Sequence, residues 1–147
     1  MVLGAACDLA AQVDAVTALA LAILLGRDPV LVTMVWQSFP ADRVLAVALV
    51  EYESGFNARL LRPAYGGSTD WGLFQLNSYW HPQYRGNLAA HIREGAGFLL
   101  CLMLTYRKSG EATVLFSLSH YNAGKPWSKR GLRYAQRVLS LRGRLER

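Results

Sequence analysis

The sequence predicts one mostly helical domain of the α+β class, in which a bundle of helices surrounds a central buried helix. Apolar residues recur at intervals of three and four through most of the chain, a period typical of helices. The stretch Val44–Val50 is apolar all round, which is typical of a helix buried on every side. Residues 58–77 depart from this pattern because Pro63, Gly66 and Gly67 interrupt any helix. We expect a small β-hairpin or loop lobe there.

The first half of the helical part consists of two predicted segments. Residues 1–38 are expected to form an N-terminal helical extension packed on the core, with a core-facing helix over residues 5–25. The central helix is predicted over residues 40–53. It begins with Pro40, since proline is favoured in the first turn, and it is closed by Gly55.

A second long helix is predicted over residues 88–108. Asn87 is a suitable N-cap for it, and Gly110 follows its end. Gly95 and Gly97 should weaken this helix unless another part of the chain packs closely against them. Two shorter helices complete the domain, at residues 111–120 and 129–142.

The composition limits the class of protein. A length of 147 residues suits a single compact domain, and a chain that is 52% hydrophobic and 18% charged can bury a sizeable core. Disordered and collagen-like chains are therefore excluded. Two cysteines are too few for a disulfide-dense scaffold. With three histidines and no CxxC pattern, we expect no structural zinc site.

The net charge of +6 is concentrated at the C-terminal end. Residues 125–147 carry eight basic residues and a single acid, whereas the rest of the chain is close to neutral. Such a segment attracts polyanions through long-range electrostatics. Nucleic acid, an anionic wall polymer and a membrane surface all fit this charge, and so does a solvated helix face without a partner.

The N-terminal segment is apolar but lacks the pattern of a targeting signal. Its longest uncharged stretch, Ala15–Gly26, has 12 residues, whereas a membrane span needs about 20. A secretory peptide begins with positive charge, and the first charges here are Asp8 and Asp14. We therefore expect no ordinary cleaved signal peptide, and a peripheral membrane contact is the alternative to a core-facing helix.

Two carboxylates are candidates for acid–base chemistry. Glu53 closes the predicted central helix, where apolar surroundings and the negative end of the helix dipole should both raise its pKa. Asp70 lies in a Gly/Ser/Thr-rich loop and should stay ionised. Two carboxyl groups in such opposed environments are typical of enzymes that cleave glycosidic bonds. Glu51 competes with Glu53, but the two point roughly 200° apart around the helix axis.

The residues around these carboxylates resemble a known superfamily. Glu53–Asn57 together with Gly67–Ser78 closely resembles the active-site stretch of chicken-type lysozymes and of the small secretion-associated lytic transglycosylases. The 17-residue interval between the two carboxylates matches the lysozyme spacing. His120–Gly124 resembles the AYNAG motif of the soluble lytic transglycosylase family, and Tyr134 and Val138 look like the Tyr-Val pair that follows it.

This resemblance covers about residues 40–140 and implies a lysozyme-like fold for a catalytic domain at residues 39–147. It implies a peptidoglycan muramidase that cleaves the β-1,4 bond between N-acetylmuramic acid and N-acetylglucosamine. The Tyr-Asn-Ala-Gly motif favours a lytic transglycosylase that leaves 1,6-anhydro-muramic acid ends. The alternatives are a hydrolytic lysozyme of the endolysin kind and a non-enzymatic wall-binding module. Unlike chicken-type lysozymes, this chain has too few cysteines for several disulfides.

The resemblance also implies roles for single residues. Glu53 would be the catalytic acid, and Asp70 would stabilise or trap the reacting centre in hydrolysis. The implied substrate-binding residues are Gln75, Asn77, Tyr121 and Asn122. For Gln75, Asn77 and Asn122, the alternative is a structural role in which the side-chain amide holds the loop backbone by hydrogen bonds. The implied partner is the peptidoglycan glycan strand, with no nucleic acid and no cofactor, for a monomer that acts at the bacterial cell wall.

Overall fold

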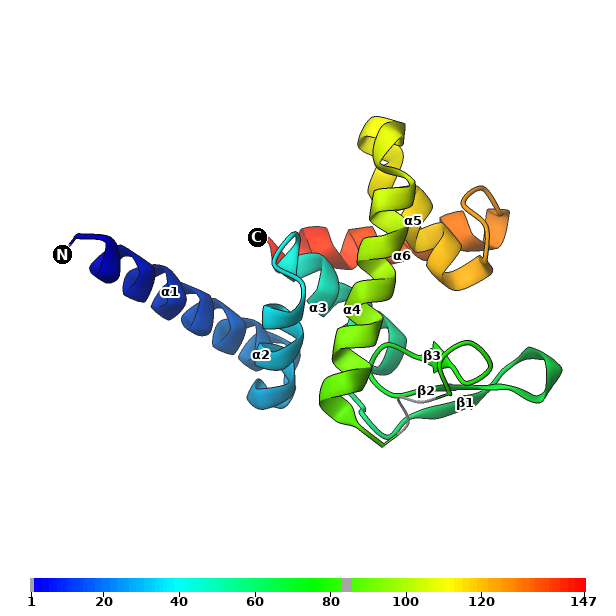
Figure 1. The fold of residues 1–147 in the computed structure, drawn as a ribbon, viewed down its shortest axis with the longest axis horizontal. Coiled ribbons are helices and arrows are strands. Elements are labelled where there is room, and N and C mark those ends of the chain that lie inside the picture. The colour runs from blue at the N-terminus through cyan, green and yellow to red at the C-terminus, as the bar shows by residue number, and fades with distance from the viewer. Residues whose placement is uncertain (1, 83–85) are drawn as a thin grey trace.

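A computed structural model describes the chain over residues 2–82 and 86–147, with side chains from residue 11 onward. Within these residues it has six α-helices and one small antiparallel sheet, which confirms the predicted mostly helical α+β class (Figure 1). The helices are α1 (Val2–Leu25), α2 (Pro29–Ser38), α3 (Arg43–Ser54), α4 (Leu88–Thr105), α5 (Thr113–Ala123) and α6 (Lys129–Leu145). The strands are β1 (Leu61–Pro63), β2 (Thr69–Trp71) and β3 (Leu76–Asn77), with short 3₁₀ turns η1 (Tyr65–Gly67) and η3 (Arg107–Ala112).

Helix α3 is the central helix, as predicted. All six side chains from Leu45 to Val50 are fully buried, and α2 and α6 pack against the helix. Its start differs from the prediction, because α2 runs on to Ser38 and Pro40 lies in the turn between the two helices. The side chain of Asp42 accepts a hydrogen bond from the backbone of Leu45 at 3.0 Å and so caps α3.

Helix α1 joins the body through its C-terminal half. Ala18, Leu21 and Ala22 belong to the hydrophobic core, and α1 packs on α2. Toward its N-terminal end the helix runs away from the other elements (Figure 1). Several apolar side chains of α1 are exposed: Val13, Val16, Leu19, Ile23 and Leu24. The division of the chain into residues 1–38 and 39–147 stays a prediction.

The three strands form an antiparallel sheet in the order β1-β2-β3. Asp70 of β2 lies opposite Arg62 of β1 on one side and Asn77 of β3 on the other. The turn between β1 and β2 needs positive φ at Gly66 (71°) and Gly67 (78°), which glycine adopts without strain. This sheet corresponds to the small β-hairpin or loop lobe that was predicted from Pro63, Gly66 and Gly67.

The N-terminal part of α4 fixes the loop between β2 and β3. The backbone N–H of Phe74 donates a hydrogen bond to Nε2 of His91 at 3.1 Å. Burial, with a smaller contribution from the charge of His81, lowers the pKa of His91 to about 4, so the ring is neutral and able to accept this bond. Gly72 lies against the same ring, where a Cβ atom would approach it to 2.7 Å.

Helix α4 ends at Thr105, three residues earlier than predicted, and η3 follows. Helices α5 and α6 run to Ala123 and Leu145, each three residues beyond the predicted ends. By length and hydropathy α4 could cross a membrane. It nevertheless packs against α2 and α5 and contributes Ile92, Ala96 and Leu99 to the core, as a core helix does.

The two glycines inside α4 differ in their surroundings, which predicts opposite effects on stability. A Cβ atom at Gly95 would lie 2.2 Å from Cγ of Phe74, whereas one at Gly97 would have no neighbour within 4 Å. We expect Gly95→Ala to lower the free energy of unfolding by about 1–3 kcal/mol through overpacking. Gly97→Ala should raise it by up to about 1 kcal/mol, because alanine favours a helix. Urea unfolding of the two variants, read from tryptophan fluorescence, tests both signs; equal effects would contradict this packing.

Candidate active site

Glu53 lies at the C-terminal end of α3, where the chain leaves the core. Its side chain is 8% exposed, and Gly55 ends the helix in the left-handed conformation with φ 57°. Glu51 points the other way and forms an ion pair with Arg27, with Oε1 2.8 Å from Nη2. Of the two glutamates predicted to compete, Glu53 is therefore the buried one.

Burial raises the pKa of Glu53 from 4.5 to about 7. The hydroxyl of Tyr134 donates a hydrogen bond to Oε1 and opposes this rise, as does the positive charge of Arg62. The negative charge of Asp70 adds a smaller increase. Because desolvation is the largest of these effects, a substantial fraction of Glu53 carries a proton at neutral pH.

Two tyrosines from the C-terminal helices surround this carboxyl group. Tyr134 of α6 donates to it, and its ring packs edge-on against Tyr52 with centroids 5.2 Å apart. Tyr121 of α5 donates instead to the backbone carbonyl of Phe74, at 2.7 Å. Burial and the nearby charge of Glu53 raise the pKa of both phenols well above 10, so both hydroxyls stay protonated.

Beside Glu53 lies a pocket of about 370 Å³. Its lining comes from α3, β1, α5 and α6, and it is polar and largely basic. The lining residues are Tyr52, Glu53, Arg62, Asn122, Arg130, Arg133, Tyr134 and Arg137. A proton on Glu53 therefore faces a space large enough for part of a sugar chain.

The structure places Asp70, Asn77 and Gln75 in the sheet lobe, outside the described lining of this pocket. The amide of Asn77 donates to Oδ1 of Asp70 at 2.8 Å and to Oγ of Ser68 at 2.9 Å. The amide of Gln75 donates to the carbonyls of Leu60 (3.3 Å) and Gly72 (2.9 Å). These bonds fit the alternative role of holding the loop, and substrate contacts of Gln75 and Asn77 stay a prediction.

The sequence-predicted residues are thus divided between two places. Glu53 and Asn122 share the pocket, whereas the hydroxyl of Tyr121 is engaged by the loop carbonyl. The basic residues of α6 were predicted as a charged tail, yet three of its arginines line the pocket. The three arginines are three and four residues apart, with Tyr134 among them, and this spacing could have indicated that they share one face of the helix. Within the described residues no cluster of His, Cys, Asp or Glu could hold a metal ion.

No protein-family model, curated protein or solved structure matches the chain. The resemblance to lysozymes and lytic transglycosylases therefore depends on the short motifs around Glu53, Asp70 and Tyr121.

Proposed function

We propose that the protein is a peptidoglycan muramidase that acts as a lytic transglycosylase on a lysozyme-like scaffold. The observation that carries this proposal is the carboxyl group of Glu53. It is buried at the end of the central helix, is partly protonated at neutral pH, and faces a polar pocket. A general acid for a glycosidic bond requires this combination, because it must hold a proton near neutral pH and deliver it to the leaving oxygen.

In the proposed reaction Glu53 donates its proton to the glycosidic oxygen between N-acetylmuramic acid and N-acetylglucosamine. The bond from that oxygen to the anomeric carbon breaks, and positive charge develops at the muramic acid. Glu53, now a carboxylate, takes the proton from the C6 hydroxyl of the same sugar, and that oxygen bonds to the anomeric carbon. The intramolecular attack benefits from a high effective concentration and yields the 1,6-anhydro ring.

The surroundings of Asp70 support this route over hydrolysis. Asp70 is bound by the amide of Asn77 and is not among the described residues that line the pocket of Glu53. Transglycosylation needs a single carboxyl group, whereas lysozyme-type hydrolysis uses a second one at the reacting carbon. Hydrolysis remains the second candidate because the charge of Asp70 is close enough to raise the pKa of Glu53.

Digestion of purified murein followed by mass spectrometry of the soluble products tests this proposal. We expect fragments with 1,6-anhydro ends, one water lighter than fragments with reducing ends. Reducing ends would replace the lyase with the hydrolase. Absence of soluble fragments from a protein whose helical content and cooperative unfolding are intact would contradict both enzymes and leave the wall-binding module.

A further inference from the structure

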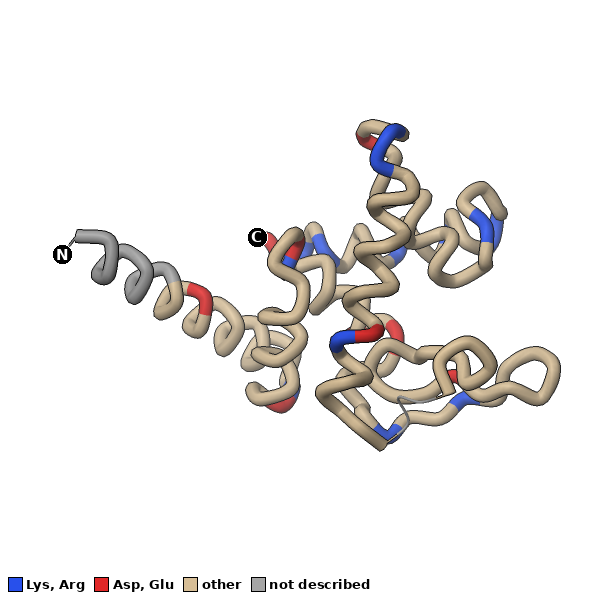
Figure 2. The backbone as a smooth tube through the Cα atoms, in the orientation of Figure 1, with Lys and Arg blue, Asp and Glu red and all other residues tan. Residues whose placement is uncertain are grey.

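Half of the side chains that line the pocket are arginines, and we refer to them as the arginine cluster. Its members are Arg62 of β1 and Arg130, Arg133 and Arg137 of α6. The three positions on α6 are three and four residues apart, so they share one face of the helix. Basic residues recur along α6 and in the segment before it (Figure 2), but this face is the one that borders the pocket.

The arginine cluster has no carboxylate partner within the part of the chain that the structure describes. The arginines that form ion pairs there are Arg27, Arg43 and Arg142, all outside the pocket. The acid that lines the pocket, Glu53, is partly neutral near pH 7. Four positive charges therefore border one polar space in which the partial charge of Glu53 is the countercharge, and an anion that enters it would be attracted by the excess positive charge.

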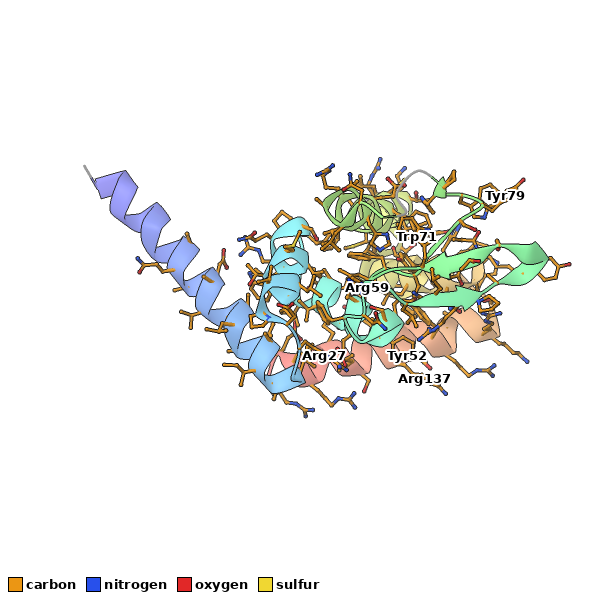
Figure 3. The ribbon with its side chains drawn as sticks, turned by 90° about the horizontal axis from the view of Figure 1, so that it is seen from below. Arg27, Tyr52, Arg59, Trp71, Tyr79 and Arg137 are labelled. Carbon is orange, nitrogen blue, oxygen red and sulfur yellow. The ribbon has the colours of Figure 1, made fainter. Side chains whose placement is uncertain are left out.

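The arginine cluster is connected to the reacting group. The guanidinium of Arg137 contacts the hydroxyl of Tyr52 at 3.5 Å, and the two side chains lie side by side (Figure 3). Tyr52 packs on Tyr134, which donates to Glu53. If Glu53 protonates a glycosidic bond in this pocket, an anionic group of the same substrate lies within reach of the arginines.

The chemistry of the arginines identifies the class of anion. A guanidinium group forms paired hydrogen bonds with the two oxygens of a carboxylate or of a phosphate. In a glycan strand of peptidoglycan the muramic acid residues carry an ether-linked lactyl group, whose carboxyl group is free or extended by a peptide with carboxylates of its own. The N-acetylglucosamine residues carry no acid.

Building on the function proposed above, we propose that the arginine cluster binds a carboxylate on the lactyl or peptide substituent of the muramic acid residue. The pocket is then the specificity site of the enzyme. It selects acidic glycan strands over neutral ones and places the muramic acid next to Glu53. A bound carboxylate also offsets the charge of Arg62, which otherwise favours loss of the proton from Glu53. Binding of the substrate therefore favours the protonated acid.

The test compares two mureins, both stripped of phosphate polymers so that carboxylates are the remaining anions. In one, carbodiimide coupling to ammonia turns the carboxylates into neutral amides and leaves the glycan intact. We expect the wild-type kcat/KM to be about tenfold or more lower on the amidated murein, since hydrogen bonds between charged groups are strong. Arg133→Gln/Arg137→Gln should lose a similar factor on untreated murein and should not distinguish the two substrates.

Arg144→Gln/Arg147→Gln is the matched control, because it removes the same charge from exposed sites at the same end of the chain, outside the pocket. It should keep the wild-type preference. Equal cleavage of both mureins by the wild type would overturn the inference and leave the proposed function standing. Cosedimentation of the Glu53→Gln variant with the two mureins tests binding without cleavage. A preference for untreated murein there supports the inference independently of catalysis, whereas equal cosedimentation with the two mureins overturns it.

Discussion

Replacing Glu53 by glutamine is expected to lower the turnover of murein about a thousandfold, within the range of about 10²–10⁴ that general acid catalysis contributes. Glutamine has nearly the same shape and can still accept the hydrogen bond from Tyr134. Its amide cannot deliver a proton to the glycosidic oxygen. The release of soluble fragments measures the loss, and the far-ultraviolet circular dichroism spectrum of the variant should be unchanged.

Glu51→Gln is the matched control for this prediction. Glu51 lies on the same helix two residues earlier, and its carboxylate pairs with Arg27 through contacts of 2.8 and 2.9 Å away from the pocket. Loss of this partly exposed pair should cost at most about 1 kcal/mol of the free energy of unfolding and leave turnover near the wild-type value. Retained activity in Glu53→Gln, or an equal loss in the control, would show that the proton comes from another group.

The helical part of the fold could be predicted because each helix carries its own signals. The apolar stretch of α3 indicates burial on every side, and Asn87 caps α4 as expected. The start of α3 could not be located as well. Pro40 and Asp42 are both acceptable near a helix start, and the choice depends on how far α2 extends before the chain turns. That length is set by the packing of α2 against α3.

A site residue could be predicted only where the helix or strand that carries it also determines how buried it is. Glu53 ends a helix that is apolar all round, so its burial and raised pKa follow from the sequence. Tyr134 comes from a helix 81 residues further along the chain, and no local signal indicates which acid its hydroxyl reaches. The amides of Gln75 and Asn77 suit sugars and loop backbone equally, and the choice is settled by tertiary contacts with neighbouring residues.

The second large effect concerns the dependence of stability on pH. Glu53 has a pKa of about 7 in the folded state and about 4.5 when unfolded. Between these values the unfolded chain loses a proton that the folded protein keeps. The stability that protonated Glu53 contributes is therefore complete below pH 4.5 and is lost as the pH rises through 7. This difference corresponds to about 3 kcal/mol of the free energy of unfolding.

His91 opposes this trend and would hide it in the wild type alone. Its pKa is about 4 when folded and about 6.5 when unfolded, so the unfolded chain binds the extra proton between these values. Its contribution to stability is present above pH 6.5 and is lost as the pH falls through 4. The two contributions have similar sizes and opposite signs, so we expect the wild-type curve to be nearly flat between about pH 4.5 and 6.5.

The Glu53→Gln variant separates the two groups, because it removes one titration and keeps the other. Its free energy of unfolding should rise between pH 4.5 and 6.5. The difference in this free energy, variant minus wild type, should be about 3 kcal/mol larger at pH 8 than at pH 4.

Tyr134→Phe should move the Glu53 midpoint to higher pH, since it removes the hydrogen bond that favours the carboxylate. Tyr106→Phe, which loses a hydroxyl bound to His120 instead, should not move it. Urea unfolding at a series of pH values measures all four proteins. Parallel curves for the wild type and Glu53→Gln would mean that Glu53 is ionised in the folded protein, and the general acid proposed here would then lack its proton.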